Sequence, residues 1–527
     1  MIRVRQVFVA IEKDTEQELK RKLAKKLNIT VDLINEYQIN KKSIDARKKD
    51  NIHYVYEIDL TIDNEEVLLK RISSNDILKI SNKKYEYTIT GNKVLDKRPV
   101  IVGSGPCGLF AAYMLAEAGF KPLILERGKD VDSRVKDVEE FWKTNSLNIN
   151  SNVQFGEGGA GTFSDGKLNT LVKDKNNRIK KILEIFVDNG APKEILYEHN
   201  PHIGTNLLRD VVKNMRNKII EKGGLFRYNS CVTDIFIENN TIKSIVVNNV
   251  ETIECYLAIF AIGHSARDTF KMLNNKGLKM QNKPFAVGFR IMHPQELINK
   301  NQYGKYHNIL KPASYKLTYN INNRGVYSFC MCPGGYVVNS SSENGKLVVN
   351  GLSNYERESK VANSAIIITV NENDYGTNLF DGIKYQEQLE KKAYELANGK
   401  IPVQLVGDYH LNRISTEFKS LKPMIKGDYD FANLNLLLNK ELNDVLKKGL
   451  ENFDKKIPGF NNKDAILAGI ESRTSSPIRI LRNEDCVSSI GGIYPGGEGA
   501  GYAGGITSAA VDGLIIFEKI ISQYKVK

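Results

Sequence analysis

Gly103, Gly105 and Gly108 have the spacing G-x-G-x-x-G, which suits a turn that holds a phosphate group. Gly103 permits a tight turn, Gly105 removes a side chain where a pyrophosphate must approach the backbone, and Gly108 lets the next helix pack closely. That helix begins with unpaired N–H groups and a partial positive charge. Glu126, 18 residues after Gly108, can accept hydrogen bonds from ribose hydroxyls. Its carboxylate repels a 2′-phosphate, so the pattern favours FAD or NAD over NADP.

Three short apolar segments must position this turn. We expect a strand over 100–102, a helix over 110–117 and a second strand over 123–125 that ends at the acid. A glycine-rich turn in an ordinary strand–helix unit would not place all of these in register, so the sequence predicts a dinucleotide site. The residues expected to contact the cofactor here are Gly103, Ser104, Gly105, Pro106, Cys107, Gly108, Glu126 and Arg127.

A second glycine-rich segment, 496–505, precedes a helix of small residues that begins at Ile506. The N-terminus of such a helix suits negative charge on a flavin ring or on the ribityl and phosphate chain. Small residues also serve close packing between helices, but the first pattern 390 residues upstream makes a cofactor role the better interpretation. The predicted contacts are Gly499, Ala500, Gly501, Gly504, Gly505 and Ile506.

The segment 155–168, FGEGGAGTFSDGKL, combines four closely spaced glycines with hydroxyl groups and a lysine. The glycines allow the backbone to press against a flat ligand, and the polar side chains donate to a pyrophosphate or to flavin oxygens. A flexible loop is the alternative. We expect a cofactor wall formed by Gly159, Ala160, Gly161, Thr162, Lys167 and Leu168.

Cys330 and His264 are the candidate catalytic residues. Cys330 and Cys332 could relay electrons, but a C-x-C disulfide is strained, so thiols that brace the turn at 333–335 are the favoured interpretation. His264 could act as a general acid or base. Arg473 could bind an anionic substrate or form a structural ion pair. No metal-ligand spacing occurs among the cysteines, and no metal is expected.

The chain has 527 residues, 41% hydrophobic and 26% charged, which is typical of a soluble multidomain protein. The net charge of +13 raises the question of nucleic acid. Its basic clusters are interrupted by acids, however, so solvated faces are favoured over a nucleic-acid partner. We expect no membrane span, no signal peptide and a reducing cytoplasm. The sequence leaves the oligomeric state open.

The predicted fold class is α/β: a Rossmann-like FAD-binding domain with an inserted α+β substrate domain, preceded by a small α+β domain. The small domain is expected over 1–95, with strands at 4–11 and 53–62 and a helix at 15–27. The FAD-binding domain is expected over 96–279 and 461–527, and the inserted substrate or cap domain over 280–460. Single strands are expected at 225–237 and 489–493, and a helix near 432–452.

These motifs resemble those of the one-Rossmann flavoproteins of the glutathione-reductase type. More narrowly, the phrases at 155–168, 201–205, 330–335 and 497–505 resemble the bacterial NAD(FAD)-utilising, FAD-dependent dehydrogenases, over nearly the whole chain. Met292 stands in a phrase where those proteins usually carry a carboxylate. The resemblance implies bound FAD and three further contacts: Val232 with the adenine, and Ala261 and Gly263 in the turn after a middle strand.

We therefore expect an FAD-dependent oxidoreductase that acts on an unidentified small molecule, with no obligatory protein nucleophile. No second fingerprint of the first kind is evident, so NAD(P)H is expected only as a transient electron donor. The alternatives are a flavin-dependent monooxygenase and a flavin-bound protein that interacts with RNA or protein through its N-terminal domain.

Overall fold

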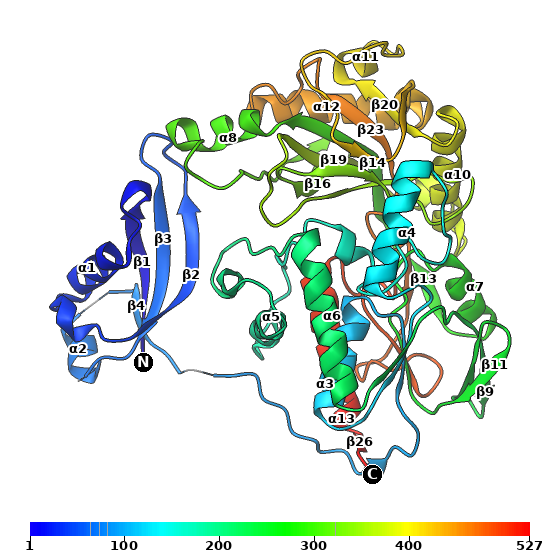
Figure 1. Cartoon of the computed structure of the whole chain (residues 1–527), viewed down its shortest axis with the longest axis horizontal. Coiled ribbons are helices and arrows are strands. Elements are labelled where there is room, and N and C mark those ends of the chain that lie inside the picture. The colour runs from blue at the N-terminus through cyan, green and yellow to red at the C-terminus, as the bar shows by residue number, and fades with distance from the viewer. Residues whose placement is uncertain (64, 73, 82, 322) are drawn as a thin grey trace.

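A computed structural model describes residues 1–527 except 64, 73, 82 and 322 (Figure 1). The N-terminal part is a four-stranded sheet of order β2-β3-β1-β4 with two helices. Helix α1 buries Leu19, Leu23, Ala24 and Leu27, the apolar face that its periodicity predicts, against this sheet. The elements are β1 (Ile2–Ala10), α1 (Glu16–Leu27), β2 (Tyr37–Asp45), β3 (His53–Leu60), α2 (Glu65–Arg71) and β4 (Ile77–Lys79).

The next domain is built on five parallel strands in the order β25-β12-β6-β7-β8. β6 (Val100–Val102) and β7 (Leu123–Leu125) have the predicted bounds, since both are short buried apolar runs. The other strands are β8 (Leu225–Arg227), β12 (Ala258–Phe260) and β25 (Ile493–Pro495).

Helices cover one face of this sheet and a small antiparallel sheet covers the other. α3 (Pro106–Glu117), α6 (Thr205–Glu221) and α13 (Ile506–Ile521) share the first core. A Cβ on Gly513 of α13 would lie 2.4 Å from the Cys107 carbonyl oxygen of α3, so these two helices pack in close contact. The other core lies against α7 (Arg267–Asn275), β9 (Val232–Glu238), β10 (Thr241–Val247) and β11 (Glu251–Glu254).

The second large domain contains a seven-stranded sheet of order β15-β16-β19-β14-β23-β20-β22. Its two central strands, β14 (Phe285–Pro294) and β19 (Val361–Val370), pair antiparallel over their whole length. Helix α12 (Lys440–Lys456) buries its apolar face in the core of this sheet. The other elements are α8 (Gln295–Tyr303), β15 (Thr318–Ile321), β16 (Arg324–Cys332), α10 (Asp381–Leu396), β20 (Ile401–Leu405), β22 (Tyr429–Phe431) and β23 (Ile466–Glu471).

The α/β class with a Rossmann-like domain is confirmed, but three predicted elements are wrong. The single strand at 225–237 is two strands in different sheets, because Asn229 adopts a left-handed conformation and Ser230 bonds back to the Glu126 carbonyl. The strand at 489–493 begins only at Ile493, after a turn, and the helix near 432–452 begins at Lys440.

The chain crosses between the two large domains at one antiparallel pair, β13 (Met280–Asn282) with β24 (Ile478–Ile480). β23, which lies beyond the predicted boundary at 460, is a strand of the seven-stranded sheet. The segment after β4 leaves the N-terminal sheet and runs beside α13 (Figure 1), where β5 (Lys93–Val94) pairs with β26 (Tyr524–Lys525). We therefore propose boundaries near residues 80, 283 and 477.

Candidate functional site

A cavity of about 390 Å³ lies beyond the carboxyl ends of β6, β12 and β25, and its far wall is formed by β16 and β18 (Val349–Leu352). The ends of parallel strands are where α/β proteins bind ligands. Most residues predicted from the glycine-rich segments and from the resemblance meet at this cavity: Gly103, Gly105, Pro106, Cys107, Glu126, Arg127, Gly159, Ala160, Gly161, Lys167, Val232, Ala261, Gly263, Gly504, Gly505 and Ile506.

The first fingerprint forms the floor of the cavity. Gly103 has a φ of +98°, and a Cβ there would lie 2.5 Å from the Ala261 carbonyl oxygen. A Cβ on Gly108 would lie 2.0 Å from the Gly103 carbonyl oxygen, so Gly108 serves helix packing and lies outside the cavity lining. α3 and α13 both begin at a glycine, Gly105 and Gly505, which has no side chain to cap the first amide groups. Two sets of helix N–H donors are thereby available to an anion.

Glu126 is buried and its carboxylate accepts four protein hydrogen bonds. The donors are the Ser104 amide (2.9 Å) and hydroxyl (2.6 Å), the Gly128 amide (2.9 Å) and the Gly156 amide (3.1 Å). A carboxylate offers about four lone-pair positions. A ribose hydroxyl at Glu126 would therefore share an oxygen that already holds the loops together.

Sequence reasoning missed Arg134 of α4 (Val131–Thr144), whose guanidinium organises the glycine-rich loop. The side chain is fully buried, and it donates to five backbone carbonyls at 2.7–3.2 Å. Burial lowers its pKa to about 9. No motif marks this residue, because it acts through carbonyls that are distant along the chain. The acceptors are the carbonyls of Asn152, Val153, Gly156, Glu157 and Gly159.

The remaining predicted residues lie outside the cavity lining and support it. Thr162 directs its hydroxyl toward the Glu157 carbonyl, and Leu168 is in the core. A Cβ on Gly499 would lie 2.5 Å from the Gly263 carbonyl oxygen, and Ala500 is fully buried. Gly501 has a φ of +84° and packs against β24. By contrast, the neighbouring Gly504 does line the cavity. A Cβ on Gly504 would meet no atom within 4 Å in the described part of the chain.

His264 and Glu498 form a pair at the cavity wall. The Nδ1 atom of His264 lies 2.9 Å from a Glu498 carboxylate oxygen. Its Nε2 atom is buried and has no hydrogen-bond partner among the residues that the structure describes. Both residues line the cavity.

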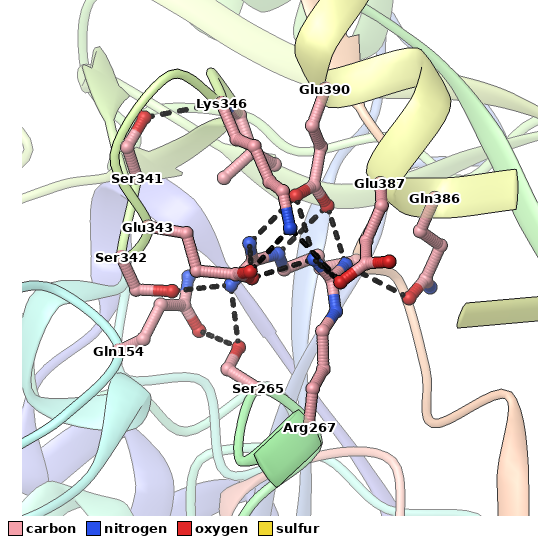
Figure 2. A network of polar contacts seen from close by, with 12 residues as sticks. Gln154, Ser265, Arg267, Ser341, Ser342, Glu343, Lys346, Gln386, Glu387 and Glu390 are labelled. Atoms are coloured by element: carbon pink, nitrogen blue, oxygen red, sulfur yellow. Dashed lines mark hydrogen bonds and ion pairs between the residues drawn. The ribbon is translucent and has the colours of Figure 1, made fainter. Parts of the chain in front are cut away.

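The second domain forms the opposite wall with Cys330, Asn350, Glu471, Arg473 and Thr474. The sequence indicated Cys330 as a candidate, and it gave substrate binding as one of two possible roles for Arg473. A buried ion network between Arg267 of α7 and Glu390 of α10 ties these two helices together (Figure 2). Arg473 joins this network through the same glutamate. Its guanidinium donates to Glu390, Glu343, Ser265 and Ser342, so every N–H group has an acceptor. Of the two roles that its sequence context left open, the structural ion pair is the one observed.

Two predicted absences concern metal ions and membranes. Among the residues that the structure describes, no group of three or more His, Cys, Asp or Glu could hold a metal ion. Within the same described ranges, no helix is long and apolar enough to cross a membrane.

The fold and the cavity define a dinucleotide-binding protein, and the family matches identify it as FAD-dependent. Residues 284–474 match the family described as "FAD-dependent protein, C-terminal domain-like". Residues 101–151 match an NAD(P)-binding Rossmann-like domain, and residues 1–61 match a domain of unknown function.

The chain is 46% identical over 531 residues to an uncharacterized protein of Clostridium beijerinckii, which covers 99% of each protein, and it belongs to the same family as that protein. Solved structures that are similar include CtdE in complex with FAD (12% identity, 80% and 82% of the two chains, TM-score 0.31). L-proline dehydrogenase of P. horikoshii is another (15% identity, 81% and 93%, TM-score 0.33).

The residues present fit FAD. Gly105 and Gly159 face one another without side chains, two helix N-termini supply free N–H groups, and the buried His264 Nε2 atom needs a partner. The negative diphosphate suits both helix ends. Bound FAD supplies two-electron redox chemistry, while the protein positions it and excludes water.

Proposed function

We propose that this protein is a dehydrogenase-like FAD-dependent oxidoreductase of the one-Rossmann, glutathione-reductase-like kind, acting on a small molecule at the junction of its two large domains. The observation that carries this proposal is one continuous cavity that reaches from the phosphate turn after β6 to the wall formed by β16 and β18. An elongated dinucleotide fits such a cavity better than a compact ligand does.

The arrangement of the cavity favours one direction for the cofactor. The adenosine end fits the region of Glu126 and Val232, and the diphosphate fits the N-terminus of α3. The flavin ring would then extend toward Gly161 and Gly505, at the start of α13 and beside Lys167. Positive charge from the helix end and the lysine would stabilise negative charge on the reduced ring.

The substrate would bind against the second domain, where Asn350 and Thr474 offer hydrogen-bonding groups. No protein nucleophile is required for hydride transfer, because the cofactor carries the difficult step. A nicotinamide electron donor would visit the same cavity transiently. A substrate would be recognised by its effect on the flavin spectrum.

The experiment that tests this function compares wild type with Gly105→Leu. The leucine side chain would fill the space between Gly105 and Gly159, whose Cα lies 3.8 Å from a Cβ at Gly105. Wild-type protein should be yellow with FAD rather than FMN, and the variant should be folded and colourless. Gly325→Ala, in the second domain and away from the cavity lining, is the matched control and should retain FAD. Wild type that binds no FAD refutes the proposal, and substrate-triggered oxygen uptake would indicate a monooxygenase instead.

A further inference from the structure

Two cysteines lie at the cavity wall opposite the Rossmann turn: Cys330 lines the cavity, and Cys332 is buried next to it. β16 has an irregularity between Phe329 and Cys332 where its pairing with β19 shifts register. Cys330 lies in this irregularity with a φ of +43°, a conformation that non-glycine residues rarely adopt. Such outliers persist where the surrounding structure holds them and are common at active sites. The cysteine side chain there lines the cavity.

Cys332 lies directly behind Cys330. It is fully buried, and its Sγ atom donates to the Cys330 carbonyl oxygen at 3.3 Å. An accessible thiol with a buried thiol behind it is the arrangement of an attacking and a resolving cysteine.

Two cations flank the pair, the half-buried Lys167 and the fully buried Arg290. Lys167 donates to the carbonyl of Met331, between the two cysteines, and lies 3.2 Å from Asp165. Arg290 donates to the Cys330 carbonyl at 2.8 Å and approaches the Cys332 sulfur at 3.9 Å. The Cys332 thiol, Lys167 and Arg290 hold the pKa of Cys330 well below its ordinary value, whereas the contact with Cys330 and burial raise the pKa of Cys332. Of the two thiols, Cys330 is therefore the one that loses its proton more readily.

We propose that Cys330 and Cys332 form a redox-active dithiol–disulfide pair that exchanges two electrons with FAD bound in the cavity. The inference rests on the proposed function, since it requires FAD at the junction of the two domains. It gives the protein two redox centres, the flavin and the sulfur pair, where the flavin alone would supply one.

The electron balance of the exchange is complete. The Cys330 thiolate and the Cys332 thiol form one S–S bond, and the S–H bond of Cys332 breaks. The pair loses two electrons and one proton. FAD gains the same two electrons and the proton and becomes the singly protonated anionic reduced flavin. In the reverse direction the reduced flavin cleaves the disulfide. A disulfide between alternate residues is strained, and strained disulfides are the readily reduced, catalytic ones.

The test is an anaerobic titration of the FAD-loaded protein with dithionite, followed at the flavin absorbance and by counting free thiols. The protein is first oxidised with diamide so that the pair starts as a disulfide. Wild type should consume twice the reducing equivalents per FAD that Cys330→Ser and Cys332→Ser consume. Cys231→Ser is the matched control, because Cys231 also lines the cavity but lies on the Rossmann side. This variant should titrate like wild type.

A second measurement does not depend on the flavin. Apoprotein treated with diamide should lose two hydrogen atoms in the peptide that contains Cys330 and Cys332, and neither serine variant should do so. Wild type that binds reducible FAD but consumes a single two-electron equivalent overturns the pair while the proposed function stands. Protein that binds no FAD overturns both. A doubled capacity that survives in Cys330→Ser also overturns the assignment.

Discussion

Replacing Arg134 with lysine should separate the order of the glycine-rich loop from the fold as a whole. The arginine holds five backbone carbonyls of residues 152–159 through a guanidinium that spans them. Lysine keeps the positive charge, but its ammonium is a single point with three donors and cannot reach carbonyls on both sides. At least two of the five hydrogen bonds must be lost.

The magnitude follows from those bonds. A hydrogen bond from a charged group contributes roughly 1.5–3 kcal/mol net, so the loss of two costs about 3–6 kcal/mol locally. Domains of this kind have roughly 5–15 kcal/mol of stability, so we expect a folded protein with a disordered loop. FAD must then order that loop on binding. Since about 1.4 kcal/mol is a tenfold change, a cost of about 3 kcal/mol weakens FAD binding by roughly 100-fold.

The assay is titration of apoprotein with FAD, followed by quenching of flavin fluorescence, with circular dichroism as the measure of folding. Arg209→Lys is the matched control. Its guanidinium lies 5.1 Å from the centroid of the Phe163 ring, and Arg134 lies 4.8 Å from the same ring. In the described part of the chain Arg209 makes no hydrogen bond to the loop. Arg134→Lys protein that binds FAD within threefold of wild type would refute this reasoning.

Two further predictions concern stability and the domain boundary. Glu390→Gln should destabilise the protein by roughly 3–5 kcal/mol in denaturant unfolding, because two buried arginines lose the fully buried carboxylate that they share. The exposed Glu395→Gln should change little. Burial alone would raise the pKa of Glu390, but the two arginines lower it overall, so its contribution is present above about pH 4 and is lost as the pH falls further. Deleting residues 1–80 should leave a yellow, folded remainder, because the N-terminal sheet has its own core. A deletion that also removes Tyr85 should lower the thermal midpoint, because Tyr85 bonds to Glu518 of α13. If the two deletion variants have equal thermal midpoints, the boundary of the N-terminal domain lies later in the chain than residue 80.

The sequence alone determined the elements whose identity depends on neighbours in the chain. The strand, turn, helix and strand from Val100 to Glu126 follow from short-range patterns. Gly103 has a positive φ in the turn, and a Cβ on Gly108 would meet the nearby Gly103 carbonyl oxygen. The start of α13 at Ile506 follows for the same reason. The predicted cofactor is FAD, and the matching family and the fold confirm it.

Only the tertiary structure decided how distant segments complete the site. Arg134 and Glu126 hold the glycine-rich loop through backbone groups, which leave no mark on the sequence. Arg473 is the same residue type whether it binds a substrate or a buried network, and only the acceptors around it distinguish the two roles. Cys330 acquires its charged surroundings from Lys167 and from β14, far away along the chain. Such properties depend on long-range contacts and burial, which local spacing cannot specify.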